Sequence, residues 1–270
     1  MGSDGDGNGE RGTGHGKRNA RAILSNASKV LVLTGAGISA ESGVPTFRGP
    51  GGLWKEFRAE DLATPEAFAR DPRLVWEWYG WRREKVAACT PNPGHTALAR
   101  WMLSRSGVTL VTQNVDGLHE AAGRSLGGSD PARAMPVRLH GSIARVRCTS
   151  CAFAADDATS IDATSLDTLP HCPSCHALLR PDVVWFGEPL PVDALLRAEQ
   201  AARSADACLV VGTAGAVYPA AGFVLTVGRR GKPVIVVDPG ETGFDDVATA
   251  KLVGKAGDIL PVILSEAKDP

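Results

Sequence analysis

Hydrophobic and polar positions divide the chain into short, almost wholly apolar runs and longer segments with helical spacing. The apolar runs are rich in β-branched residues and cover residues 29–33, 108–112, 207–211 and 233–237. Runs of this kind are typical of strands that are covered on both faces in a parallel sheet. Because helical segments lie between them, the pattern predicts an α/β fold with a doubly wound, Rossmann-like parallel sheet.

Two segments interrupt this alternation. Residues 51–105 are rich in Trp and Arg and predict helices, whereas residues 141–180 carry two Cys-x2-Cys pairs. We expect the two insertions to form a second, smaller domain, helical in one part and metal-binding in the other, with a binding cleft between the domains. The larger domain then consists of residues 19–50, 106–140 and 181–264.

The cysteine pairs predict a metal site. Cys148 and Cys151 are followed, after a spacer of 20 residues, by Cys172 and Cys175. This spacing is typical of a zinc site built from two knuckles, and it is favoured over disulfides or unligated cysteines in a reducing compartment. Four thiolates complete a tetrahedron, so we expect one structural zinc ion with no open coordination position.

Loops with glycine and polar residues follow the four predicted strands. After the first strand, Gly35-Ala36-Gly37-Ile38-Ser39-Ala40 forms the G-x-G-x-x-A turn that lets a dinucleotide pyrophosphate approach closely. The acidic residue that usually follows about 20 positions later is absent. Parallel sheets bind ligands at the carboxyl ends of their strands, so these loops predict one extended nucleotide site.

The composition of the chain limits the classes of partner that it is expected to bind. The 270-residue chain is 43% hydrophobic, and its formal net charge is −1. It lacks the concentrated positive charge of a nucleic-acid-binding protein, a signal peptide and any apolar run of about 18 residues. We therefore expect a cytoplasmic monomer that binds neither nucleic acid nor membranes. Residues 1–18 are rich in glycine and polar residues and are expected to form a disordered tail.

Several motifs together resemble the sirtuins, the NAD-dependent protein lysine deacylases. They are TGAGISAESGVPTFRG at 34–49, TQNVDGLH at 112–119, LHG at 139–141, the cysteine pairs and VVWFGE at 183–188. The resemblance spans about residues 25–262. It implies NAD as cofactor, acyl-lysine proteins bound as extended peptides as substrates, and release of nicotinamide and O-acyl-ADP-ribose.

The resemblance also implies residue roles. His140 matches the general base, and Asn114 and Asp116 match residues that orient the ribose and the nicotinamide; an Asx turn remains the alternative for these two, and His119 is expected to be structural. The implied NAD-binding residues are Gly35, Ala36, Gly37, Ser39, Ala40, Glu41, Thr46, Phe47, Arg48, Trp54, Gln113, Asn114, Val115, Asp116, Gly212, Thr213, Ala214, Asp238, Pro239, Gly240 and Ala256. The implied peptide-binding residues are Val184, Trp185, Phe186, Gly187 and Glu188.

Two of the implied NAD-binding positions depart from the family pattern. Ala214 stands where Ser is usual, and Asp238 where Asn is common. One hydroxyl is lost and one charge is added, so these changes bear on NAD affinity and not on the reaction class.

The acyl group is suggested by Tyr79 and Arg82, which share one helix face at a spacing of three residues. With Ala63 they resemble the class III sirtuins, which remove succinyl, malonyl and glutaryl groups. A small Ala63 leaves room, Arg82 offers a planar fork to a carboxylate, and Tyr79 offers a hydroxyl. Alternatives remain open: a sirtuin that is mainly a deacetylase, a zinc-ribbon regulator that binds NAD or ADP-ribose without turnover, and an ADP-ribosyltransferase.

Overall fold

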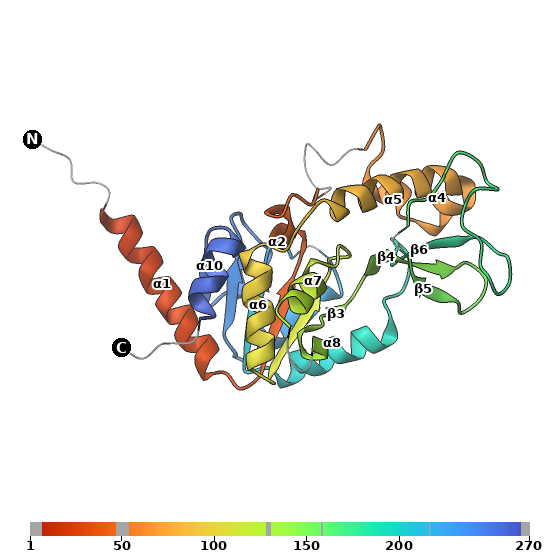
Figure 1. Cartoon of the computed structure of the whole chain (residues 1–270). Helices are drawn as coiled ribbons and strands as arrows, with labels where there is room; N and C mark the ends of the chain where they lie inside the picture. Colours follow the sequence, from red (N-terminus) through yellow and green to blue (C-terminus); the bar gives the residue numbers. More distant parts are fainter. Residues whose placement is uncertain (1–6, 47–53, 128–130, 158, 216, 266–270) are drawn as a thin grey trace, which may run out of the picture.

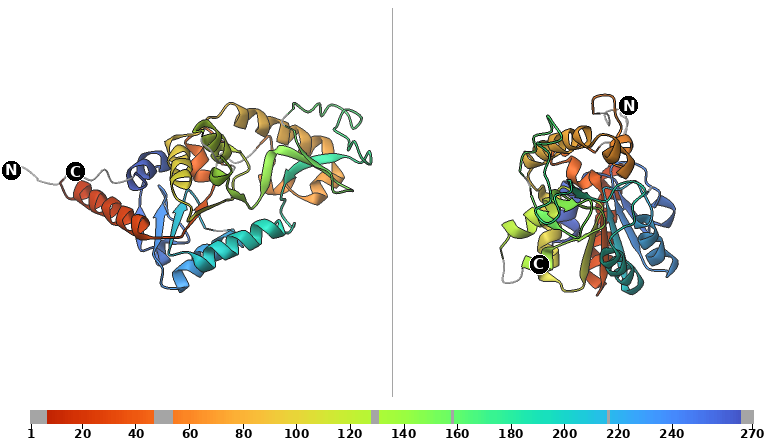
Figure 2. Two further views of the ribbon diagram at one scale, coloured as in Figure 1. Left: turned by 60° about the horizontal axis from the view of Figure 1, so that its bottom comes forward. Right: turned by 90° about the vertical axis from the view of Figure 1, so that its right-hand side faces the viewer.

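The computed structural model describes residues 7–46, 54–127, 131–157, 159–215 and 217–265. Its larger domain is built on a six-stranded parallel sheet with the order β3-β2-β1-β7-β8-β9, covered by helices on both faces (Figures 1 and 2). This confirms the predicted doubly wound fold. The strands are β1 (Val30–Thr34), β2 (Val108–Thr112), β3 (Val137–Arg138), β7 (Ala207–Val211), β8 (Val234–Val237) and β9 (Ala250–Leu252).

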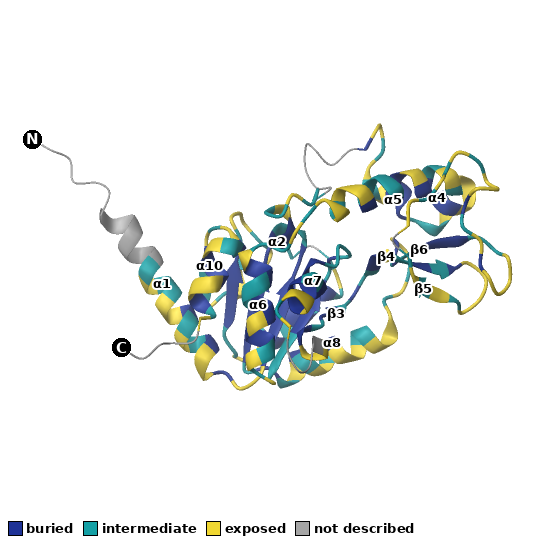
Figure 3. Cartoon of the chain, in the orientation of Figure 1, coloured by how far each residue is buried: buried dark blue, intermediate teal, exposed yellow. Residues whose placement is uncertain are grey.

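Strand β1 lies at the centre of this sheet. Val30 pairs with Val108 of β2 on one side and with Ala207 of β7 on the other. All residues of β1, β7 and β8 are buried, as the dark blue strands of Figure 3 show. The four apolar runs therefore form the strands that their pattern predicts, whereas β3 and β9 are too short to leave a pattern in the sequence.

Two groups of helices cover the two faces of the sheet. On one face lie α1 (Gly7–Asn26), α6 (Pro93–Ser104) and α10 (Ala256–Ile263), which share a core around Leu24, Leu98 and Leu260. On the other lie α8 (Val192–Ser204) and α9 (Ala220–Arg229). Shorter elements of this domain are α2 (Ala36–Ala40), α7 (Leu118–Ser125), η1 (Pro131–Ala134) and η2 (Asp245–Val247).

The smaller domain combines helices and an antiparallel sheet in one core. Its helices are α3 (Ala59–Leu62), α4 (Pro65–Arg70) and α5 (Pro72–Ala87), and its strands, in the order β5-β4-β6, are β5 (Ala154–Asp156), β4 (Gly141–Cys148) and β6 (Leu179–Val183). Helix α5 begins at Pro72, and the Asp71 side chain caps it by accepting from Leu74 N. Trp76, Trp78 and Tyr79 of α5 pack against residues of β4 and β6. The two insertions thus bury one shared core.

Three predicted boundaries differ from the structure. The backbone is helical from Gly7, so α1 occupies most of the expected tail, and Ala20 and Leu24 anchor it to the sheet domain. Helix α6 lies within the predicted insertion but packs on the large sheet. Strand β6 continues to Val183 and belongs to the small sheet. In each case tertiary packing decides the boundary, and local pattern does not encode it. No helix in the described ranges has the length and apolar character needed to cross a membrane.

Candidate active site

The loops after β1 and β7 interlock at the carboxyl end of the sheet. Gly35 N donates to Val211 O at 3.1 Å, and Gly37 N donates to Gly212 O at 2.8 Å. A Cβ atom on Gly37 would lie 2.7 Å from the Gly212 Cα, and one on Gly35 would lie 2.6 Å from the Thr213 Cβ. Only glycine fits both positions, so the predicted phosphate loop is held in close contact with the loop that follows β7.

Asn114 joins the loop after β2 to the glycine loop. Its Nδ2 donates to Gly35 O at 3.0 Å and to Ser39 Oγ at 3.1 Å, and its backbone N donates to Thr112 Oγ1 at 3.1 Å. These bonds fix the plane of a side chain that is only 9% exposed. Nearby, Gln113 Nε2 donates to Thr213 Oγ1 at 3.1 Å, which ties this loop to the third one as well.

Asp116 has both a local and a site-facing role. Its Oδ1 accepts from Leu118 N at 2.9 Å, which is the Asx turn that the sequence left open. Burial raises the pKa of Asp116, against the opposing effects of hydrogen bonds from Leu118 and Ser39. A carboxylate held at such a cost in free energy is typical of functional sites.

The two ring nitrogens of His140 are in different environments. Its Nδ1 lies 3.0 Å from Gln113 O. A carbonyl can only accept, so Nδ1 carries a proton and donates it to this bond. The His140 carbonyl in turn accepts from Val184 N at 3.0 Å. His140 therefore lies between the loop after β2 and the predicted peptide-binding segment.

A cavity of about 110 Å³ brings the loops after β1 and β2 together with α5 of the small domain. It unites predicted NAD-binding residues with Arg82, the predicted acyl-binding residue. Its lining residues are Ala36, Val44, Pro45, Thr46, Arg82, Lys85, Val86, Gln113, Asn114, Val115 and Asp116.

Two buried histidines support the floor of the site. His119 Nε2 lies 2.9 Å from Thr34 Oγ1, and His95 Nε2 lies 3.4 Å from Ser39 Oγ. Burial lowers the pKa of His95 to about 3 and that of His119 to about 4, so both stay neutral at physiological pH. His119 is packed internally, in line with its expected structural role. His95 was not predicted from the sequence, because a single histidine in a helical segment gives no signal of its contact with Ser39.

Several predicted NAD-binding residues make internal contacts. The Glu41 carboxylate accepts from Ala256 N at 2.6 Å and from Gly257 N at 3.0 Å, so it caps α10. Asp238 Oδ1 accepts from Gly240 N at 2.8 Å at the end of β8. Trp54 is buried in the small domain. Phe47 and Arg48, which are also predicted to bind NAD, lie outside the described residues.

The predicted peptide-binding segment is anchored on both sides. Val184 N bonds to His140 O, and Phe186 N donates to Ala63 O at 2.9 Å. The Phe186 side chain is 53% exposed, whereas Trp185 is 3% exposed. Glu188 faces inward and pairs with Arg147 and Arg180. Internal bonds thus engage most backbone N–H groups of this segment, which presents the Phe186 side chain from a rigid base.

The predicted acyl-selecting pair, Tyr79 and Arg82, is more buried than expected. Tyr79 has no exposed surface, and its hydroxyl accepts from Trp185 Nε1 at 2.9 Å. The Arg82 guanidinium carbon lies 4.8 Å from the Trp78 ring centre and 5.2 Å from that of Tyr79. Of these two residues only Arg82 lines the cavity, so Tyr79 can influence the site only through the side chains that it contacts.

The four predicted metal ligands converge at the far end of the small domain. Cys148 Sγ lies 3.4 Å from Cys175 Sγ, and Cys151 Sγ lies 3.6 Å from Cys172 Sγ. All four sulfur atoms lie within 4.8 Å of one another. Zinc with bonds of about 2.3 Å separates tetrahedral sulfur ligands by roughly 3.8 Å. The cluster fits one zinc ion, and none of its cysteines lines the cavity that contains Arg82 and Asn114.

The sequence of this chain is similar to that of a known family along most of its length. The family model described as "Sir2 family" matches residues 35–219. The "NAD-dependent protein deacylase" of Thermococcus kodakarensis is 50% identical over 255 residues, covering 93% of this chain and 95% of the relative. The enzyme of the same description from Pyrococcus abyssi is 48% identical over 251 residues, covering 91% and 96%.

Solved structures agree. A Sir2 homologue in complex with NAD is 43% identical, has a TM-score of 0.81 and covers 92% of both chains. A Sir2 homologue mutant in complex with 2'-O-acetyl ADP ribose is 44% identical, with a TM-score of 0.81 and coverage of 91% and 94%. A Sir2 protein bound to an acetylated peptide is 27% identical, with a TM-score of 0.76 and coverage of 92% and 96%. The chain belongs to the Sir2 family.

Proposed function

We propose that the chain is an NAD-dependent protein lysine deacylase with a preference for acidic acyl groups. The observation that carries the proposal is the cavity in which Asn114 and Asp116 meet Arg82, close to the base His140. Relatives that match over nine tenths of the chain are named for NAD-dependent protein deacylation.

The chain's own residues fit NAD. The backbones of Gly37 and Gly212 touch without an intervening side chain, so the loops after β1 and β7 form one continuous surface for a dinucleotide. Gly35, Ser39, Gln113, Thr213 and Asp238 would hold the cofactor along the carboxyl ends of the strands. NAD, when bound, supplies the ADP-ribosyl group that accepts the acyl group as nicotinamide leaves.

His140 supplies the base for this reaction. Its Nδ1–H bond to the Gln113 carbonyl fixes the tautomer and leaves the basic lone pair of the ring on Nε2. Nε2 can then take a proton from a hydroxyl that comes within hydrogen-bond reach. Asn114 is held by two bonds that its Nδ2 donates, which leaves its amide oxygen as the acceptor for a ligand.

The peptide would bind along residues 184–188. Extended peptides bind many proteins in a mode in which main-chain bonds give affinity and pockets select side chains. The half-exposed Phe186 lies where such a peptide would pass. A related Sir2 protein has been solved with an acetylated peptide, which supports this mode.

The charges around the cavity support an acidic acyl group. Arg82 and Lys85 both line it, and burial lowers the pKa of Arg82. A partly desolvated guanidinium is stabilised by an anionic partner, and a carboxylate accepts two of its N–H groups at once. Succinyl, malonyl and glutaryl chains carry such a carboxylate at their end, whereas acetyl does not.

One set of rate measurements tests this proposal. Acetyl-, malonyl-, succinyl- and glutaryl-lysine peptides should be compared with and without NAD. A charge-assisted bond contributes about 1.5 to 3 kcal/mol, so kcat/KM should favour the acidic peptides by roughly tenfold to hundredfold. Arg82→Met should remove this preference and leave acetyl activity nearly unchanged.

Arg73→Met is the matched control, because Arg73 is an exposed residue on the same helix that does not line the cavity. It should change neither rate. An equal loss on acetyl and succinyl peptides in Arg82→Met would show that Arg82 supports the helix and not the acyl group, and an ordinary deacetylase would then be the better assignment. Turnover without NAD would contradict the reaction class itself.

A further inference from the structure

The Tyr79 hydroxyl is oriented by a partner from the peptide-binding segment. Trp185 Nε1 donates to it at 2.9 Å, across a separation of 106 residues in sequence. An indole N–H can only donate, so the tyrosine oxygen must accept. The phenol is thereby fixed in rotation, and the Arg82 guanidinium carbon lies 5.2 Å from the centre of its ring.

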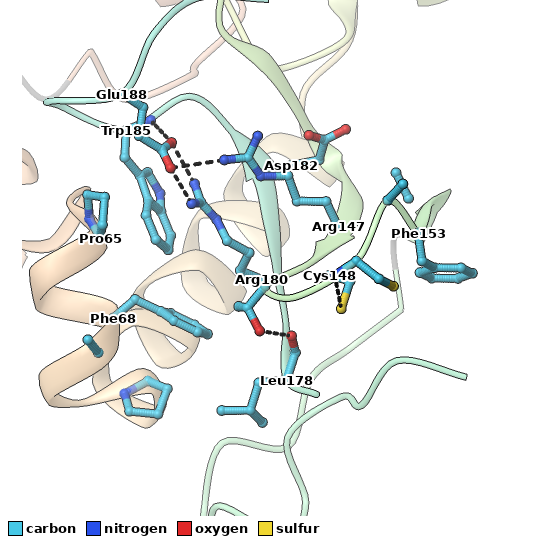
Figure 4. Close-up of a pocket in the computed structure, with 16 residues that line it drawn as sticks. Pro65, Phe68, Arg147, Cys148, Phe153, Leu178, Arg180, Asp182, Trp185 and Glu188 are labelled. Atoms are coloured by element: carbon cyan, nitrogen blue, oxygen red, sulfur yellow. Dashed lines mark hydrogen bonds and ion pairs between the residues drawn. The ribbon is translucent and has the colours of Figure 1, made fainter. Parts of the chain in front are cut away.

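Trp185 is itself held by an ion-pair network. The Arg180 guanidinium lies 3.2 Å from the indole centre, and Arg180 donates to both carboxylate oxygens of Glu188 at 2.5 and 2.9 Å. Trp185 N donates to Glu188 Oε2 at 2.8 Å. The Glu188 carboxylate therefore binds both Arg180, which lies over the indole ring, and the backbone of Trp185. Figure 4 shows these contacts converging on Glu188. Such a buried, paired network restricts the indole to one orientation.

The far side of the indole is packed as well. Phe68 of α4 lies with its ring centre 5.4 Å from that of Trp185. A groove of about 760 Å³ opens beside Phe68, Arg147 and Arg180, on the side of the small domain that carries the zinc ligand Cys148 (Figure 4). The indole therefore separates this groove from Tyr79.

We infer that Trp185 is a positioning residue for acyl selection: its N–H holds the Tyr79 hydroxyl against Arg82 and so fixes the guanidinium that lines the cavity. This rests on the proposed acidic-acyl preference and deepens it. The peptide-binding segment and the acyl-selecting pair are then one unit, built from residues 185 and 188 on one side and 79 and 82 on the other.

The test compares selectivity, defined as the ratio of kcat/KM for succinyl-lysine to that for acetyl-lysine peptide. Trp185→Phe keeps an aromatic ring beside Phe68 and Arg180 but removes the N–H. Loss of one neutral hydrogen bond should lower selectivity roughly 2- to 10-fold. The change should appear mainly as a higher KM for the succinyl peptide, and Trp185→Phe should add nothing in a Tyr79→Phe background.

Trp101→Phe is the matched control. Trp101 is also buried and also lies beneath an arginine, Arg105, but it packs in the sheet domain. It should leave selectivity unchanged. An equal fall of both rates in Trp185→Phe, or the same further loss in the Tyr79→Phe background, would overturn the inference and leave Trp185 with a packing role.

A spectroscopic readout is independent of turnover and of NAD. The chain has six tryptophans, and the Trp185 indole signal in a ¹H–¹⁵N spectrum is identified by its loss in Trp185→Phe. Tyr79→Phe should move that proton upfield, and an unmoved signal would overturn the inference. If wild type shows no succinyl preference, the proposed function fails; if wild type and Arg82→Met behave as proposed but Trp185→Phe keeps full selectivity, only the inference fails.

Discussion

At the scale of single residues, His140 shows how a side chain's backbone partner sets its chemistry. The sequence suggested a base at this position, and the structure adds that Nδ1 is engaged by Gln113 O, 27 residues away. Tyr79 shows the opposite case. Its helical spacing from Arg82 was clear, but its complete burial beneath Trp185 was not. Periodicity says which residues share a helix face and not what covers that face.

His140→Ala should lower deacylation by roughly 10² to 10⁴, the range for a positioned general base. The loss should appear in single-turnover rates with saturating NAD and acyl peptide, because it removes a proton acceptor and not a binding contact. Melting temperature and zinc content should stay at wild-type values. A rate within about twofold of wild type would exclude His140 as the base.

At the scale of helices and strands, the length of a strand determined whether its hydrophobic pattern could be recognised in the sequence. Four apolar runs predicted β1, β2, β7 and β8, whereas β3 and β9 have two and three residues and fall below any recognisable period. Helix α6 shows a second limit. The sequence predicted helices in this region, but which of the two domain cores α6 joins depends on its contacts with α10, which begins 152 positions after α6 ends.

The glycine loop offers a test at this scale. Gly37→Ala would place a Cβ 2.7 Å from the Gly212 backbone, so the loops after β1 and β7 must separate. We expect weaker NAD binding in calorimetry and a lower melting temperature. Gly80→Ala on α5 is the control, because a Cβ there meets nothing within 4 Å. In a helix interior it should stabilise the fold by about 0.5 to 1 kcal/mol. Unchanged NAD affinity in Gly37→Ala would argue against this loop as the cofactor site.

At the scale of the whole molecule, we expect the small domain to stay folded only while its four cysteines hold zinc. Cys148 and Cys172 belong to the same buried core as Trp76. Metal binding energy in such sites is folding energy, so a chelator or Cys148→Ser should unfold this domain and abolish deacylation. Five of the six tryptophans lie in this domain's core, so their fluorescence reports on it.

Cys89→Ser provides the comparison, because Cys89 lies outside the cluster and should keep full zinc content. A Cys148→Ser protein that is fully active without zinc would contradict the structural role.

Stability should also depend on pH through the two buried histidines. In the unfolded chain both titrate near 6.5, whereas their folded pKa values are about 3 for His95 and about 4 for His119. Between these limits the unfolded chain binds more protons, so the free energy of unfolding falls as pH drops from about 6.5 towards 4. Each histidine contributes a slope of up to about 1.4 kcal/mol per pH unit. Urea titrations at several pH values should show a slope smaller by that amount in His95→Gln, and equal slopes would refute the assignment.

The sequence by itself determined the fold class, the zinc ligands and the positions of the nucleotide loops. These features are local. A Cys-x2-Cys pair, a glycine turn after an apolar run and a His-Gly dipeptide can each be recognised from a few consecutive residues. Only the tertiary structure decided that Glu41 caps α10, that His95 supports Ser39, and that Trp185 orients Tyr79. These contacts join residues between 56 and 215 positions apart. They depend on how side chains pack across the folded core, and no spacing along the chain indicates that packing.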